Sequence, residues 1–142
     1  MNIFEAAIDG NLDQIEELIK NGVDVNDIDD RDEYKRTALH FASSYGELET
    51  VQYLVGNGAD VNARDEDDRT ALHFASSYGE LETVQYLVGN GADVNARDED
   101  DRTALHCASD NGHLELVKYL VEKGSDVNSR DYKGRTPLYT AS

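Results

Sequence analysis

The sequence predicts an all-α solenoid, a linear array of helical units stacked on one another. Residues 36–68 read RTALHFASSYGELETVQYLVGNGADVNARDEDD, and residues 69–101 repeat them letter for letter at an offset of 33. Each unit contains two short helical patterns, and each pattern has a single apolar stripe. Because one unit cannot bury its stripes alone, it has to pack against its neighbours.

The array runs through the whole chain, which we interpret as a single domain. Residues 102–134 are a diverged copy, and residues 135–142 begin another copy with RTPLYTAS. A distant copy opens the chain, with Gly10, Leu12 and the triplet Asp24-Val25-Asn26 in matching positions. The predicted units are 1–35, an N-terminal cap unit with an extended loop, then 36–68, 69–101, 102–134 and the partial unit 135–142.

The first helix of a unit is bounded by clear start and stop signals. Thr37 precedes the run Ala-Leu-His-Phe-Ala and is typical of an N-cap, whose hydroxyl accepts from first-turn amides. Gly46 stands where a left-handed residue ends a helix. We therefore expect a helix between Thr37 and Gly46, with the same helix 33 residues later.

The second helix follows directly. Leu48, Val51, Leu54 and Val55 form one apolar stripe at helical spacing, and Gly58 ends the pattern. We expect residues 59–63 to be extended and residues 64–68 to form a polar turn that leads into the next unit. Each unit is then helix, short turn, helix, extended loop.

These residues resemble the ankyrin repeat. The pattern Thr-Ala-Leu-His-x-Ala, Gly, Leu-x-x-Val-x-x-Leu, Gly-Ala-Asp-Val-Asn recurs at 33 residues over nearly the whole chain. The resemblance implies that the helices stack as antiparallel pairs and that the extended loops become β-hairpin fingers projecting from the stack. It also implies that the concave face, made by the fingers and first helices, binds another protein.

Two departures from the family pattern bear on stability. Ala38, Ala71 and Ala104 stand where the family favours Pro, which only Pro137 keeps. The fingertip Gly of the family survives as Gly134, and the other three tips have Lys35, Asp68 and Asp101 instead. If these three residues lie at positive φ, each is strained by roughly 1 kcal/mol.

The first finger and the two ends of the chain also differ. Nine residues separate Asn26 from Arg36, against six between Asn62 and Arg69, so the first finger has a three-residue insertion. Phe4 replaces the recurring His, which suits a cap. Residues 135–142 either cap the stack or come from a longer array. We expect a monomer, with end-to-end self-association through an exposed apolar face as the alternative.

Composition narrows the function. The 142 residues include 13 Lys+Arg and 30 Asp+Glu, a formal net charge of −17. Such acidity argues against nucleic-acid binding and against docking on anionic lipid. The chain has one Cys and no long apolar run near Met1, so nothing requires an oxidising compartment or indicates a signal or membrane helix. We expect an intracellular, cytoplasmic protein.

Nothing in the sequence predicts catalysis, a metal or a cofactor. His40, His73 and His106 recur one per unit, too far apart to share an ion, and are interpreted as hydrogen-bonded structural residues, like His113. The acidic run from Asp65 lacks the Gly and Glu that a calcium loop needs. Cys107 replaces Phe41 and Phe74 and has no base at a defined spacing. We therefore expect a protein that is not an enzyme.

The candidate partner-binding residues fall on two predicted surfaces. Tyr is enriched in binding hot spots, and the Ser-Tyr pairs that end the first helices would look into the concave groove by the resemblance. The fingertips are strongly negative and would steer a basic partner. Groove candidates are Ser44, Tyr45, Ser77, Tyr78, Asp110 and Asn111; finger candidates are Arg36, Glu66, Asp67, Arg69, Glu99, Asp100, Arg102, Tyr132 and Lys133.

The identical copies leave a second hypothesis open. Exposed positions drift because most surface substitutions cost within roughly 0.5 kcal/mol, so packing alone does not explain 33 identical residues. The duplication is either recent or engineered. The alternative function is then that of a structural or folding scaffold, a repeat array with no selected ligand.

Overall fold

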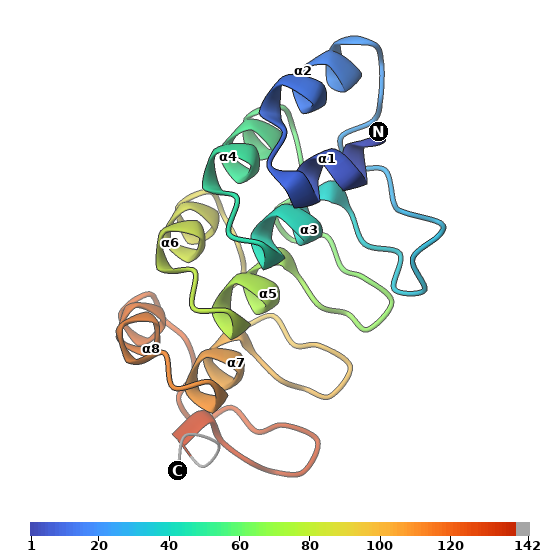
Figure 1. Ribbon diagram of the computed structural model, residues 1–142. Coiled ribbons are helices and arrows are strands. Elements are labelled where there is room, and N and C mark those ends of the chain that lie inside the picture. Colours follow the sequence, from blue (N-terminus) through green and yellow to red (C-terminus); the bar gives the residue numbers. More distant parts are fainter. Residues whose placement is uncertain (139–142) are drawn as a thin grey trace.

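The computed structural model describes residues 1–138; residues 139–142, the end of the partial unit, lie outside the described part. Its helices come in pairs, and together they form an all-α stack (Figure 1). The pairs are α1 (Ile3–Asp9) with α2 (Leu12–Lys20), α3 (Ala38–Ser44) with α4 (Leu48–Gly56), α5 (Ala71–Ser77) with α6 (Leu81–Gly89), and α7 (Ala104–Asp110) with α8 (Leu114–Glu122).

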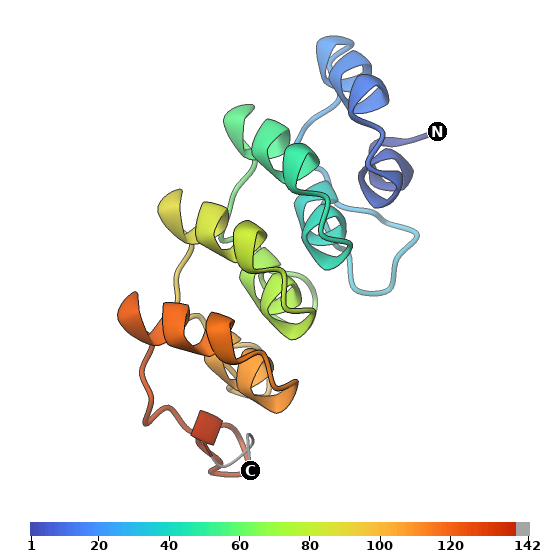
Figure 2. The same cartoon turned by 60° about the vertical axis from the view of Figure 1, so that its left-hand side comes forward.

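The first helices form one row and the second helices another. Figure 2 shows the pairs stacked one after another in chain order, with α1 and α2 at one end of the stack and α7 and α8 towards the other. Contacts are closest along the row α1, α3, α5, α7 and within each pair, and looser along the row α2, α4, α6, α8. The buried residues of both rows join in one continuous core.

The predicted helix boundaries are confirmed. Thr37, Thr70 and Thr103 are N-caps whose side chains accept from the backbone of the His three residues later. Gly46 follows the last turn of α3 with φ 66°. A Cβ there would lie 2.5 Å from a carboxylate oxygen of Glu80, a contact that this flexible side chain would relieve by shifting, so the positive φ is the main reason for Gly.

Burial follows the predicted stripe of the second helix. Val51 and Leu54 are fully buried, and Leu48 and Val55, at the edges of the stripe, are half-buried. The stripe therefore faces the core along its centre and meets the neighbouring units along its edges, which agrees with the expectation that a single unit is not self-sufficient.

The loop after the second helix is less extended than predicted. The Ala63 amide donates to the Asp60 carbonyl at 3.2 Å, which closes a turn over residues 60–63. The side chain of Asp60 accepts from the Asn62 amide at 2.9 Å. Asp and Asn side chains favour such local bonds over extended backbone, which explains the difference.

Asn side chains tie each unit to the next. The amide nitrogen of Asn26 donates to the Gly58 carbonyl at 3.0 Å, and its oxygen accepts from the Asp60 amide at 2.8 Å. Asn62 and Asn95 make the equivalent pairs of bonds one and two units further on. These clamps fix the register between neighbouring units.

The fingers are folded-back loops that project on one side of the stack (Figure 1). Each is closed by a backbone bond, for example from the Asp65 amide to the Arg69 carbonyl at 3.0 Å. Within residues 1–138 no strand forms, and one isolated antiparallel bridge joins Ile28 to Thr37 in the longer first finger. The fingers thus make hairpin-like turns without a strand ladder.

The fingertip residues Lys35, Asp68 and Asp101 adopt the positive φ that the missing glycines predict, at 51°, 59° and 59°. We expect Asp101→Gly to raise the free energy of unfolding by about 1 kcal/mol, because Gly adopts this conformation without strain. Asp100→Gly removes the same charge next door without relieving strain and is the control. Urea unfolding of both variants tests this, and equal stability of the two would contradict it.

Candidate functional site

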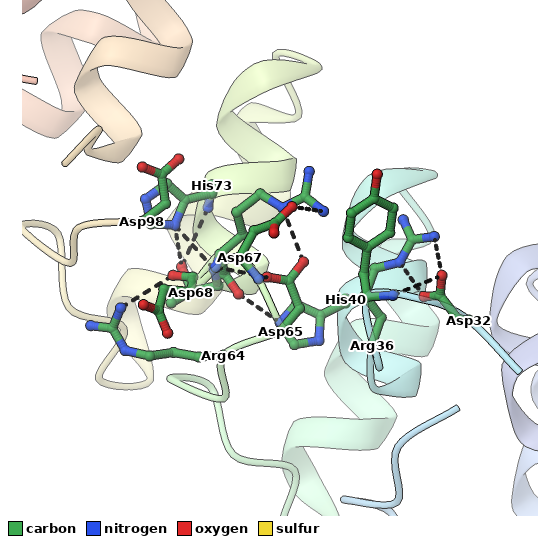
Figure 3. Close-up of polar contacts among 12 residues, drawn as sticks. Asp32, Arg36, His40, Arg64, Asp65, Asp67, Asp68, His73 and Asp98 are labelled. Atoms are coloured by element: carbon green, nitrogen blue, oxygen red, sulfur yellow. Dashed lines mark hydrogen bonds and ion pairs between the residues drawn. The ribbon is translucent and has the colours of Figure 1, made fainter. Parts of the chain in front are cut away.

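A buried or half-buried carboxylate shapes the base of each finger. The side chain of Asp65 is fully buried and accepts from the Arg69 Nε at 3.0 Å and from the Asp67 and Arg69 amides (Figure 3). Asp131 makes the same contacts with Arg135 in the last finger. In the longer first finger, Asp32 replaces it and accepts from the Arg36 Nε at 2.6 Å. These arginines are therefore held in place by ion pairs.

A histidine on each of the helices α3, α5 and α7 links that helix to the finger that follows it in the chain. Nδ1 of His73 accepts from the Thr70 amide at 3.0 Å, so its Nε2 carries the proton and donates to the Arg102 carbonyl at 2.9 Å. His40 and His106 make equivalent contacts with the Arg69 and Arg135 carbonyls. Burial lowers the pKa of all three imidazoles. The structural role predicted for these residues is confirmed.

The fourth histidine is structural as well. His113 precedes α8, and its Nε2 lies 3.1 Å from the carbonyl oxygen of Ser77. Its ring lies under Gly79, where a Cβ would approach it to 2.7 Å. Among residues 1–138, no group of three or more His, Cys, Asp or Glu side chains is placed to hold a metal ion. In the same range, no helix is long and apolar enough to cross a bilayer.

Three groove candidates of the two identical units, Ser44, Tyr45 and Tyr78, meet in one hollow, whereas the fourth, Ser77, does not line it. A pocket of ≈ 460 Å³ lies between the ends of α3 and α5 and is lined by Arg36, Phe41, Ser44, Tyr45, Phe74, Tyr78 and Glu80. Tyr45 and Tyr78 stand at its mouth with 59% and 62% of their surface exposed. We call this hollow, defined by these seven residues, the tyrosine groove.

Arg36, Phe41 and Phe74 line the tyrosine groove, and each of the two Phe rings has an arginine stacked on it. The Arg36 guanidinium lies 4.7 Å from the Phe41 ring centre, and that of Arg69 lies 4.8 Å from the ring of Phe74. Tyr34 lies within 4.7 Å of the Arg69 guanidinium as well, which joins the groove to the first finger. Sequence reasoning missed this stacking, although Arg and Phe recur together at the 33-residue period.

The stack of rings stops at the last complete unit. Cys107 takes the place of Phe41 and Phe74, and it is buried, which raises the pKa of its thiol. With Cys107 at this position, Arg102 has no Phe ring to stack on. Its guanidinium nitrogens lie 3.4 Å from a carboxylate oxygen of Asp110 and 3.7 Å from one of Asp131. Asn111 donates to the Cys107 carbonyl at 2.8 Å. Asp110 and Asn111 therefore lie beyond the tyrosine groove.

The fingertip candidates form a second surface. Backbone bonds run from tip to tip, from Glu66 to Tyr34, from Glu99 to Asp67 and from Tyr132 to Asp100. The charge of Asp67 raises the pKa of the exposed Glu99 carboxyl, with Asp98 and Asp100 adding to it. We call Glu66, Asp67, Glu99 and Asp100 the acidic tip row. The last finger departs from it, with Lys133 lying 5.4 Å from the ring centre of Tyr132.

Comparison with known proteins places the chain among repeat proteins. Residues 3–98 and 97–142 match the family described as ankyrin repeats (3 copies). Human protein phosphatase 1 regulatory subunit 27 is 46% identical over 61 residues, which cover 43% of this chain and 38% of that protein. Human DNA-binding protein RFXANK is 38% identical over 60 residues, 42% of this chain and 22% of that protein. Each match thus spans less than half of either protein.

Proposed function

Since the chain belongs to the ankyrin-repeat family, we propose that it is a non-enzymatic scaffold that binds a protein partner with a basic surface. The contact would involve the acidic tip row and the tyrosine groove. Proteins of this family generally mediate protein–protein interactions, and the finer assignment to a basic partner and to these two surfaces is ours.

The observation that carries the proposal is the acidic tip row. Its carboxylates repel one another, as the raised pKa of Glu99 indicates, and the ion pairs at the tips are few. Nζ of Lys35 lies 3.4 Å from a carboxylate oxygen of Glu66, and Nη2 of Arg69 lies 3.5 Å from a carboxylate oxygen of Asp67. A basic partner surface would relieve this repulsion, and a row of like charge also speeds the encounter with such a partner.

The tyrosine groove supports the same proposal through contact area. Tyr45 and Tyr78 are both exposed although each could bury a large apolar ring, and Tyr residues of this kind are enriched in hot spots. Arg36, which lines the groove, is already paired with Asp32, so its charge does not dominate the groove. Glu80 adds a carboxylate to the lining.

The names of the two relatives differ in what they indicate. One is a regulatory subunit of a phosphatase, which agrees with a role in binding another protein. The other is called a DNA-binding protein. For this chain, a net charge of −17 opposes contact with phosphate backbones, and we propose a protein partner and not a nucleic acid.

The tyrosine groove can be tested by affinity capture. We expect the double variant Tyr45→Ala/Tyr78→Ala to bind its partner at least about tenfold more weakly, because truncating a hot-spot aromatic typically costs more than about 1 kcal/mol. The matched control is Gln52→Ala/Gln85→Ala, which alters two exposed residues at the same spacing on the second helices. Identical sets of captured proteins for the wild type and the tyrosine variant would overturn the groove assignment.

A second candidate function is a repeat array with no selected ligand, and the letter-for-letter identity of residues 36–68 and 69–101 favours it. Deleting residues 69–101 distinguishes the two. The deletion removes Phe74, Tyr78 and Glu80, and with them one wall of the tyrosine groove. We expect it to abolish capture of the partner, whereas unchanged capture would show that the extra unit is architectural.

A further inference from the structure

The arginines beside the tyrosine groove show how this fold holds a guanidinium group. The Arg36 guanidinium lies over the Phe41 ring, 4.7 Å from its centre, and its Nε donates to the Asp32 carboxylate at 2.6 Å (Figure 3). Arg69 makes the same two kinds of contact one unit later. An aromatic ring and a carboxylate thus act together, the ring on the face of the guanidinium and the carboxylate at its N–H groups.

The tyrosine groove offers the same two kinds of group to a ligand. The exposed rings of Tyr45 and Tyr78 stand at its mouth, and the half-buried Glu80 lines it. Among residues 1–138, the Glu80 carboxylate accepts no hydrogen bond and joins no ion pair. It lies against Gly46 of the preceding unit, so packing holds it in place. A partly desolvated carboxylate without a polar partner favours a cation beside it.

Neighbouring junctions of the stack lack this combination. Glu47 occupies the equivalent position one unit earlier, but Glu5 and Asp9 stand there in place of the aromatic rings. One unit later, His113 replaces the glutamate and Asn111 replaces the tyrosine. Within residues 1–138, two exposed Tyr rings and an unpaired carboxylate therefore meet only between α3 and α5.

The charges around the groove favour a cation even though Arg36 lines it. Both Nε and Nη2 of Arg36 donate to Asp32, at 2.6 Å and 3.3 Å, so its charge is compensated locally. Residues 1–101, which contain the groove, include 7 basic and 25 acidic residues. A positively charged side chain is therefore attracted to this part of the molecule, and an anionic one is repelled.

We propose that the tyrosine groove binds one arginine side chain of the basic partner, an inference that rests on the function proposed above. Its guanidinium stacks on the rings of Tyr45 and Tyr78 and donates to the Glu80 carboxylate. Arginine suits this site better than lysine, because a planar guanidinium can stack and donate at once, whereas an ammonium group is compact and strongly hydrated. The acidic tip row attracts basic residues of either kind, and the groove selects arginine.

Two labelled peptides test this selection. One contains lysine only, and the other is identical except for an arginine at its centre, so that both have the same length and charge. By fluorescence anisotropy we expect the wild type to bind the arginine peptide about tenfold more tightly. The acidic tip row cannot produce this difference through charge alone, and neutralising it should weaken both peptides and leave their ratio unchanged.

Glu80→Gln should reduce the preference for the arginine peptide to about one. Glu47→Gln is the matched control, because it makes the same change at the equivalent position of a junction without rings, and it should keep the preference. Equal binding of the two peptides by the wild type, or a preference that survives Glu80→Gln, would overturn the inference and leave the acidic tip row standing. Failure of both peptides to bind would overturn the proposed function itself.

The role of the rings is tested in the same assay. Tyr45→Phe/Tyr78→Phe keeps both ring faces and should keep the preference for arginine, whereas Tyr45→Leu/Tyr78→Leu should lose it. Urea unfolding of each variant shows whether the fold is intact, and both side chains are exposed, so little change is expected. A preference that persists in the leucine variant would contradict stacking on these rings.

Discussion

The protein is expected to lose stability steeply as the pH falls from 7 towards 5. Burial disfavours the charged imidazole ring. It is the main reason why the pKa values of His40, His73 and His106 lie below the ordinary 6.5. In each ring Nδ1 accepts a backbone hydrogen bond from a Thr, and protonation of Nδ1 would break that bond. The neutral form is thus built into the fold.

The direction follows from proton binding in the two states. Below pH 6.5 the unfolded chain binds protons at these histidines and the folded chain does not, so acid favours unfolding. The stabilisation from the three neutral histidines is complete above pH 6.5. It is lost as the pH falls from 6.5 through the lower pKa values that these histidines have in the folded state. In this window three histidines together change the free energy of unfolding by up to about 4 kcal/mol per pH unit.

Other titrating groups act outside this window. Asp32 and Asp131 have pKa values below the ordinary 3.8, so the stability that they contribute is lost only in stronger acid. Glu99 acts in the opposite sense, because its raised pKa means that its protonation, near and above 4.5, favours the folded state. Loss of stability between pH 6.5 and 5.5 is therefore specific to the histidines.

Urea unfolding at pH 7.5, 6.5 and 5.5 measures this effect. The variant His73→Leu removes one of the three groups and should reduce the slope by about a third, whatever its own stability. His113→Leu is the control, because that ring is only partly buried and makes a single hydrogen bond. A free energy of unfolding that does not change between pH 7.5 and 5.5 would contradict the tautomer assigned to these rings.

Local signals explain why much of the fold could be predicted from the sequence. Thr37 as an N-cap, Gly46 as a helix stop and the strained tips at Asp68 and Asp101 each depend on a few adjacent residues. The period of 33 then extends one correct unit to the whole chain. The turn at residues 60–63 was missed because the competing bond comes from a side chain, that of Asp60.

The site was predicted less completely, because its geometry depends on contacts between units. Tyr45 and Tyr78 do meet in one hollow, but nothing in either copy alone indicates that Glu80 of one unit lies against Gly46 of the other. Nor does the sequence show that Arg36 stacks on Phe41 while paired with Asp32. Such arrangements appear only once neighbouring units are placed side by side.

Neutralising the acidic tip row should weaken binding of a basic partner by about 100-fold at low salt. The variant combines Glu66→Gln, Asp67→Asn, Glu99→Gln and Asp100→Asn. A row of like charge raises the rate of association with a partner of opposite charge by about 10- to 1,000-fold at low salt, and the four substitutions together remove this row. The substitutions keep the size of each side chain and leave the backbone bonds between the tips in place. The fold should therefore persist.

A labelled peptide of alternating Lys and Arg is the probe, and fluorescence anisotropy gives its affinity. The control variant neutralises four exposed glutamates on the second helices, Glu16, Glu17, Glu49 and Glu82, and changes the net charge by the same amount. If the tip row is the binding surface, its variant loses both affinity and salt dependence, while the control loses little. Equal losses in the two would mean that the probe responds only to the overall charge. The proposed surface would then be wrong, because a local contact depends on where the charges lie and screening at about 0.15 M salt removes interactions beyond roughly 8 Å.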